Sequence, residues 1–171
     1  MDKNLLFVIG TRPELIKMFP IINYLKLNNL KNYRIASTGQ HKELLEPYWE
    51  VFGITSDFDL NIIKKGQSLS SLTVRAIEAI DNLLNEIKTE FKVDVIFSQG
   101  DTTTVMASSI VAFYHNIKFA HIEAGLRSKD IRSPFPEEFN RKVAGITAHY
   151  HFAPTEGAKE NLLRENVSSK D

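Results

Sequence analysis

Three short apolar runs in this sequence each end in a dense polar motif. In order, the runs and the motifs that follow them are 5–9 with 10–14, 95–97 with 98–104, and 119–120 with 121–127. Continuous apolar runs of this length are typical of parallel strands that are buried on both faces. In an open parallel sheet, ligands bind at the carboxyl ends of the strands. The charged side chains that we expect along this edge are Arg12, Glu14, Asp101, Glu123 and Arg127.

Predicted strands and helices alternate along the whole chain. The apolar runs predict strands at 5–9, 33–38, 95–98, 118–122 and 149–152. Helical spacing predicts helices at 13–28, 41–52, 68–91, 102–115, 137–147 and 156–164. We expect Pro20 to kink the first helix or to shift its start. The pattern predicts an α/β fold with a doubly wound, mostly parallel sheet and helices on both faces.

Composition and charge exclude several classes of protein. The 171 residues suit a single domain, and 21 basic against 21 acidic residues give no argument for nucleic acid or an anionic membrane as partner. The absence of cysteine excludes disulfides and fits a reducing compartment. There is no signal-like start, and the apolar run at 5–9 is too short to span a bilayer, so we expect a cytoplasmic protein. Among five histidines only His149 and His151 are closely spaced, which predicts no metal site.

The motif Gly-Thr-Arg-Pro-Glu at 10–14 falls at a predicted turn from strand to helix. Gly10 allows a tight turn and close approach to a ligand, and the helix N-terminus offers free N–H groups to an anion. Arg12 and Lys17 are therefore candidates to hold a phosphate. A capped helix start with surface charges explains the same residues without a ligand. The motif lacks the Gly-x-Gly-x-x-Gly pattern, which disfavours NAD.

The acidic residues of the other motifs each allow two interpretations. Asp101 is either a helix cap or part of a polar wall with the threonines that follow it. Glu123, at the end of a buried strand, needs Arg127 or His121 as a partner, or it serves in proton transfer. Two acids at 137–138 suit the first turn of a helix because of its dipole. The preceding polar loop, 127–135, could close over a ligand.

Taken together, the ordered motifs resemble the non-hydrolysing UDP-N-acetylglucosamine 2-epimerases. The matching segments are 10–14, 40–41, 59–61, 100–104, 121–127 and 133–141. The resemblance implies a fold of the glycosyltransferase-B type, in which two Rossmann-like halves enclose the active site. The chain would then be a single N-terminal domain, 1–171, without the C-terminal nucleotide-binding half, and would be inactive alone.

The resemblance also implies a reaction and a set of site residues. The family inverts C2 of UDP-GlcNAc to give UDP-ManNAc by eliminating UDP and adding it back, without a redox cofactor or an obligatory metal. Asp101, Glu123 and Glu137 match its catalytic acids. Arg12, Lys17 and Arg141 match residues that bind the substrate.

Regulation and assembly follow from the same resemblance. Gln40 and His41 match part of a site where regulated bacterial members bind a second UDP-GlcNAc, whereas Glu43 and Gly66 replace a glutamine and an arginine of some members. The family is typically homodimeric. Two alternatives stay open: a 2-epimerase for another UDP-N-acetylhexosamine, and a non-catalytic module that binds a sugar nucleotide or a partner.

Overall fold

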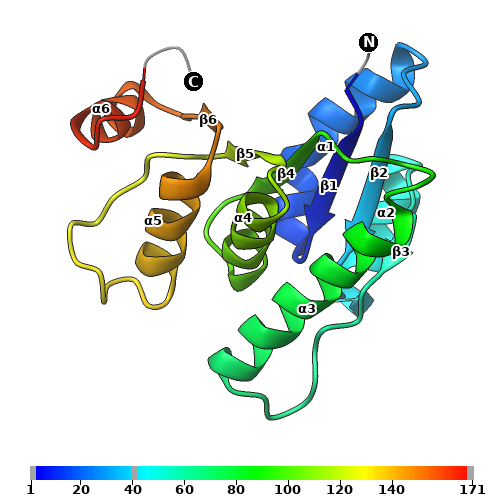
Figure 1. The fold of residues 1–171 in the computed structure, drawn as a ribbon, viewed down its shortest axis with the longest axis horizontal. Helices are drawn as coiled ribbons and strands as arrows, with labels where there is room; N and C mark the ends of the chain where they lie inside the picture. The colour runs from blue at the N-terminus through cyan, green and yellow to red at the C-terminus, as the bar shows by residue number, and fades with distance from the viewer. Residues whose placement is uncertain (1–2, 40–41, 169–171) are drawn as a thin grey trace.

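A six-stranded parallel sheet forms the centre of the computed structural model, which describes residues 3–39 and 42–168 (Figure 1). The strand order is β3-β2-β1-β4-β5-β6, and every neighbouring pair is parallel. The strands are β1 (Leu5–Ile9), β2 (Tyr33–Ser37), β3 (Phe58–Asp59), β4 (Val95–Gln99), β5 (Lys118–Ile122) and β6 (Tyr150–Phe152).

Helices connect the strands and cover both faces of the sheet. They are α1 (Arg12–Leu27), α2 (Lys42–Phe52), α3 (Leu69–Ile87), α4 (Thr103–Tyr114), α5 (Glu137–Thr147) and α6 (Glu156–Arg164). One apolar cluster packs α3 and α4 on the sheet, and a second packs α1 and α2 on its other face. This arrangement confirms the predicted doubly wound α/β fold.

The side chains of β1 show why the strand is apolar throughout. Leu6 and Val8 belong to the cluster under α3 and α4, whereas Phe7 and Ile9 belong to the cluster under α1 and α2. All four are fully buried. Successive strand residues point to opposite faces, so a strand covered on both sides needs apolar residues at every position.

Three details differ from the sequence prediction. The two-residue strand β3 is missing from the prediction because so short a segment carries no periodicity. Helix α3 ends at Ile87, and Phe91 is buried beyond the helix end. The expected shift of the first helix is wrong, since α1 begins at Arg12 and continues through Pro20. Pro20 is exposed, so the carbonyl left unbonded by its ring can be hydrated.

The strand order reverses between β1 and β4. From β1 the chain proceeds outward through β2 to β3, and it then returns to place β4 on the other side of β1. In open α/β sheets, ligands bind outside the carboxyl ends of the strands at such a switch point. The polar motifs at 10–14 and 100–104 directly follow β1 and β4, so the topology brings both of them to this position.

Candidate active site

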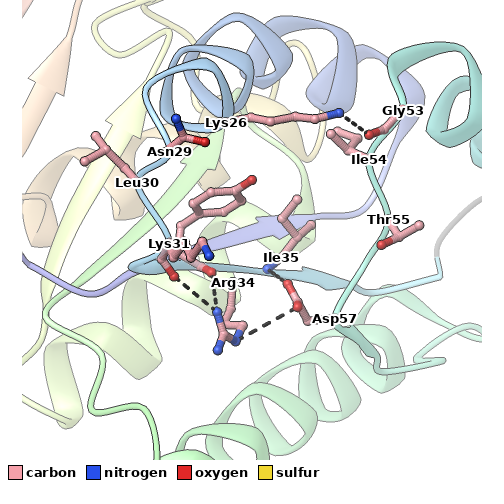
Figure 2. Close-up of a pocket in the computed structure, with 11 residues that line it drawn as sticks. Lys26, Asn29, Leu30, Lys31, Arg34, Ile35, Gly53, Ile54, Thr55 and Asp57 are labelled. Atoms are coloured by element: carbon pink, nitrogen blue, oxygen red, sulfur yellow. Dashed lines mark hydrogen bonds and ion pairs between the residues drawn. The ribbon is translucent and has the colours of Figure 1, made fainter.

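A cavity of about 560 Å³ lies at the opposite edge of the sheet, beside the amino end of β2 (Figure 2). Three of its charged side chains, those of Lys26, Arg34 and Asp57, are engaged with nearby backbone or with each other. Lys26 donates to the Gly53 carbonyl at 2.6 Å, and Arg34 donates to the Tyr33 carbonyl at 2.8 Å. Asp57 accepts from a backbone N–H of β2 at 2.8 Å. The motif residues do not line this cavity.

Asp101 lies at the carboxyl edge, in the loop between β4 and α4, and α5 holds it at two points. Arg141 Nη2 lies 2.5 Å from Asp101 Oδ2, and Asn140 Nδ2 donates to the Asp101 backbone carbonyl at 2.9 Å. The Asp101 side chain keeps 28% of its surface exposed. The carboxylate is thus fixed in direction and still accessible from outside.

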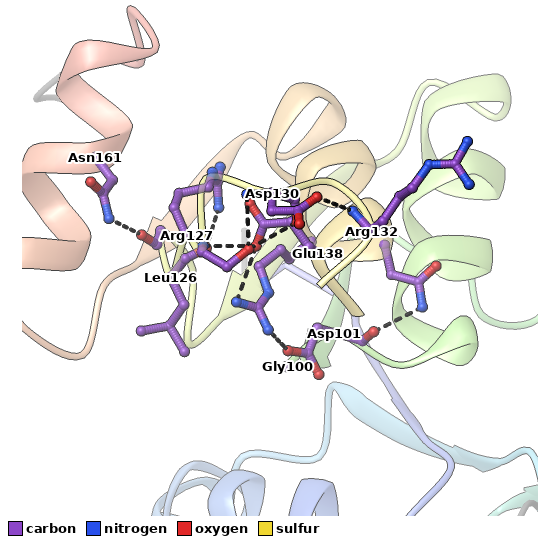
Figure 3. A network of polar contacts seen from close by, with 12 residues as sticks. Gly100, Asp101, Leu126, Arg127, Asp130, Arg132, Glu138 and Asn161 are labelled. Carbon is purple, nitrogen blue, oxygen red and sulfur yellow. Dashed lines mark hydrogen bonds and ion pairs between the residues drawn. The ribbon is translucent and has the colours of Figure 1, made fainter. Parts of the chain in front are cut away.

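Glu138, one residue from the predicted Glu137, is the buried acid of this network (Figure 3). Its Oε2 accepts from the Ser128 backbone N–H at 3.1 Å and pairs with Arg141 Nη1 at 3.3 Å. The side chain of Glu137 is partly exposed and makes no hydrogen bond or ion pair with other described residues. The helix dipole explains both acids equally well, so sequence reasoning missed Glu138. The spacing of three to Arg141 was the available signal.

Glu123 is paired with Lys17 of α1. Lys17 Nζ lies 2.8 and 2.6 Å from the two carboxylate oxygens, and the Gln99 amide donates to the same carboxylate. The expectation that Arg127 or His121 would be the partner is wrong. Glu123 has a left-handed backbone with φ of 67°, so it does not continue the side-chain alternation of β5.

Arg127 and His121 have structural partners instead. Arg127, with 5% of its side chain exposed, makes two hydrogen bonds to Glu165, at 2.8 and 2.6 Å. These hydrogen bonds hold the pKa of Glu165 below its usual value. His121 Nε2 donates to the Gly100 carbonyl at 2.7 Å, and burial lowers the pKa of His121 to about 4. A neutral imidazole therefore supports the residue before Asp101.

Glu14 is 1% exposed, and its carboxylate lies inside the turn between β1 and α1. Its Oε2 accepts from the backbone N–H groups of Gly10, at 2.5 Å, and Thr11, at 3.2 Å. Burial raises the pKa of Glu14 to about 7, although these hydrogen bonds lower it. Glu14 thus satisfies helix N-terminal donors that would otherwise face a ligand.

Arg12 is an exposed cation with no carboxylate partner among the described residues. Its guanidinium lies over the ring of Tyr48, 5.7 Å from the centroid. Tyr48 in turn contacts Phe52, which stacks on Phe19 with centroids 4.0 Å apart. The arginine is supported on an aromatic surface and has its hydrogen-bond donors available for an anion.

Four of the predicted site residues lie in two ion-paired groups, whereas Arg12 and Glu137 belong to neither group. The structure brings Asp101 together with Arg141, and Glu123 together with Lys17. The two groups are adjacent, because a Cβ built on Gly100 would lie 4.0 Å from Glu123 Oε2. The effector-site prediction for Gln40 and His41 lies outside the described residues.

The described residues lack two further features. No group of three or more histidine, aspartate or glutamate side chains there is arranged to hold a metal ion. No described helix is both long enough and apolar enough to cross a membrane.

Comparison with known proteins gives one consistent result. The family model of UDP-N-acetylglucosamine 2-epimerase matches residues 25–171. A putative UDP-N-acetylglucosamine 2-epimerase of Thermotoga maritima is 47% identical over 98% of the chain, and the Escherichia coli K12 enzyme is 46% identical over 96%. The crystal structure of UDP-GlcNAc 2-epimerase from Neisseria meningitidis bound to UDP-GlcNAc has a TM-score of 0.90 and 44% identity over 97% of the chain. The chain spans 43% of each of the two sequence relatives and 44% of the Neisseria structure.

Proposed function

The chain belongs to the UDP-N-acetylglucosamine 2-epimerase family, and we propose that it forms the first of two domains of an enzyme that interconverts UDP-GlcNAc and UDP-ManNAc. The observation that carries the proposal is the pair of adjacent carboxylates at the switch point, Asp101 and Glu123. Each is held by a cation from a different helix, Arg141 of α5 or Lys17 of α1. The substrate follows from the relatives, one of which is described with UDP-GlcNAc bound.

The reaction needs more than one proton carrier. C2 of the sugar has no neighbouring carbonyl, so removal of its proton must be coupled to departure of UDP from C1. A base takes the C2 proton, the C1–O bond breaks with its electron pair leaving on UDP, and a C1–C2 double bond forms. UDP then adds back to C1, and an acid protonates C2 from the other face. Carboxylates on separate loops supply separate proton carriers for these steps.

Asp101, Glu123 and Glu137 are the proposed proton carriers. Asp101 and Glu123 are oriented by their ion pairs, which restricts where each carboxylate can reach. Glu137 has no polar partner among the described residues, which leaves its carboxylate available to a substrate.

The leaving diphosphate requires cations that are not already neutralised. Arg12 meets this requirement best, since its guanidinium has only the Tyr48 ring beside it in the described part of the chain. Lys17 and Arg141 are each ion-paired with a carboxylate, so their positive charge is partly neutralised and their side chains are held in place. The geometry supports Arg12 as the first contact of the diphosphate, with Lys17 and Arg141 as further substrate-binding cations.

The chain supplies one wall of the proposed site. A second domain of comparable size, as in the longer relatives, would supply the opposite wall and the remaining nucleotide contacts. We therefore expect no epimerisation by residues 1–171 alone. We also propose that the complete protein is a homodimer, as is typical of the family.

The test is to incubate the full-length protein that contains this chain with UDP-GlcNAc in heavy water. The expected result is UDP-ManNAc, with deuterium at C2 in both recovered sugar nucleotides. Unchanged substrate without deuterium would refute the proposed activity. The 171-residue chain, assayed in parallel, should give neither product nor exchange.

A further inference from the structure

We propose that Glu138 is a positioning residue that sets the guanidinium of Arg141 on Asp101 and couples it to the loop at 127–135. The inference deepens the proposed function and rests on it where turnover is concerned. Glu138 does not face the outside, since none of its side chain is exposed, and it is therefore distinct from the proposed proton carriers.

A single carboxylate oxygen makes both connections. Glu138 Oε2 accepts from the Ser128 backbone N–H at 3.1 Å and contacts Arg141 Nη1 at 3.3 Å. Ser128 lies in the loop that leads from β5 to α5, ten residues before Glu138 in sequence. The position of the loop and the position of Arg141 are therefore set by the same atom.

The shape of the guanidinium transmits this contact to Asp101. Arg141 uses Nη1 for Glu138 and Nη2 for Asp101, where the distance is 2.5 Å. The group is planar and rigid, so fixing one of its terminal nitrogens restricts the direction of the other. The Arg141 side chain is 13% exposed, which leaves it little room for another rotamer.

The energetics favour a dedicated role over a surface ion pair. A buried carboxylate is costly unless it is paired and hydrogen-bonded, and Arg141 is the only cation that pairs with Glu138 among the described residues. Glu160 and Arg164 of α6 also form a glutamate–arginine pair within one helix, but their side chains are 60% and 69% exposed, so this pair is not buried. It offers a matched control on the same protein.

The experiment compares Glu138→Ala with Glu138→Gln in the full-length protein. Glutamine keeps an oxygen that can accept from both Ser128 and Arg141, whereas alanine removes it. We expect E138A to lower kcat about 100-fold, the scale of a misplacement of about 1 Å, with KM changed by less than about threefold. E138Q should recover most of that loss, and Glu160→Ala should leave kcat unchanged. Wild-type kcat in E138A, or equal losses in E138A and E138Q, would overturn the proposal.

A double-mutant cycle with Arg141→Lys tests whether Glu138 acts through Arg141. Residues that act as a unit have non-additive effects, so E138A should cost little more once Arg141 is replaced. Additive losses would show that Glu138 acts by another route and would overturn the proposal.

A readout without turnover separates this inference from the proposed activity. In the 171-residue chain, NMR signals of the Arg141 guanidinium should show restricted rotation for the wild type and E138Q, and faster rotation for E138A, in which only the contact with Asp101 is left. Unchanged rotation in a folded E138A chain would overturn the role of Glu138 even if the enzyme is active. If the wild-type enzyme is inactive and the rotation changes as expected, the activity is wrong and the positioning contact stands.

Discussion

The two edges of the sheet satisfy their charges in different ways. At the amino edge, Lys26 and Arg34 donate to backbone carbonyls beside a cavity of about 560 Å³, and the ion pair of Arg34 with Asp57 is long, at 3.9 Å (Figure 2). At the carboxyl edge, side chains pair with side chains from other elements, as in Asp101 with Arg141 and Glu123 with Lys17 (Figure 3 shows the first network). The volume of a cavity is therefore a poor guide to the site in this chain.

Sequence separation makes the same distinction. Among the amino-edge contacts named above, the widest joins Lys26 to Gly53, 27 residues apart, whereas Asp101 and Arg141 are 40 residues apart and Lys17 and Glu123 are 106 apart. Long-range pairs hold separate loops in fixed positions relative to one another. Such fixed positions are what a site assembled from several strand ends requires.

The largest expected difference between the edges is in catalysis. Asp101→Asn in the full-length protein should lower kcat about 10³-fold or more, since it removes a proposed proton carrier and half of the ion pair with Arg141. Asp57→Asn, at the amino edge, should leave kcat within about twofold, because an asparagine oxygen can still accept from β2. The measurement is the initial rate of UDP-ManNAc formation. Equal losses in the two variants would abolish the functional distinction between the edges.

Much of this fold is predictable from the sequence, whereas the pairing inside the site is not. The apolar run of β1 and the amphipathic pattern of α3 depend on local sequence; β1 is found where predicted, and α3 begins within one residue of its predicted start and ends four residues early. The partner of Glu123 depends on a left-handed residue and on a helix more than 100 positions away, so Lys17 was not anticipated as that partner. Glu138 differs from its neighbour Glu137 only in the direction it faces, which periodicity in so short a segment does not fix.

Backbone packing should differ between the edges almost as strongly. Gly125 has φ of 87°, and a Cβ there would lie 2.3 Å from the Ala158 carbonyl oxygen. Gly125→Ala should therefore lower the free energy of unfolding by about 4 kcal/mol, from overpacking together with backbone strain. Gly53, beside the amino-edge cavity, has φ of 58° and would meet only the flexible end of Lys26, at 3.4 Å. Gly53→Ala should cost about 1 kcal/mol, from backbone strain alone.

Urea denaturation of the 171-residue chain measures both values. The comparison holds if Gly125→Ala is the more damaging substitution by about 3 kcal/mol. Similar losses for the two variants would mean that α6 yields readily to the loop after β5, and that the carboxyl edge is no more tightly built than the amino edge.

Buried titratable groups give the carboxyl edge a characteristic dependence on pH. The pKa of Glu14 is raised from 4.5 to about 7 by burial, so between these values the folded state holds a proton that the unfolded chain has released. Stability from this group is complete below pH 4.5 and is lost as the pH rises through 7. His121, with its pKa lowered to about 4, has the opposite slope between pH 4 and 6.5 and opposes that of Glu14.

Glu14→Gln isolates the contribution of the carboxyl group because His121 is present in both proteins. We expect the variant to gain stability relative to the wild type by about 3 kcal/mol between pH 4.5 and 8, with most of the change complete near pH 7. Urea denaturation at a series of pH values measures the difference. A difference that does not vary with pH would show that Glu14 ionises in the folded protein as easily as in the unfolded chain.

The smallest expected effect concerns two arginines that both lie over aromatic rings. Arg12 lies over Tyr48 at the carboxyl edge, 5.7 Å from the ring centroid, and Arg34 lies over Phe91, 4.7 Å from the ring centroid. Arg34 also bonds backbone carbonyls, whereas the ring is the support for Arg12 in the described part of the chain. Tyr48→Ala in the full-length protein should weaken UDP binding about two- to fivefold, the loss of a cation–π contact of about 0.5–1 kcal/mol.

Tyr48→Phe keeps an aromatic face under Arg12 and should bind UDP nearly as tightly as the wild type. Arg34→Lys should also leave binding unchanged, because the amino edge does not face the diphosphate. Isothermal titration with UDP measures all three affinities. If Tyr48→Ala binds like the wild type, Arg12 is positioned without the ring; if Arg34→Lys weakens binding as much, the nucleotide is not confined to the carboxyl edge.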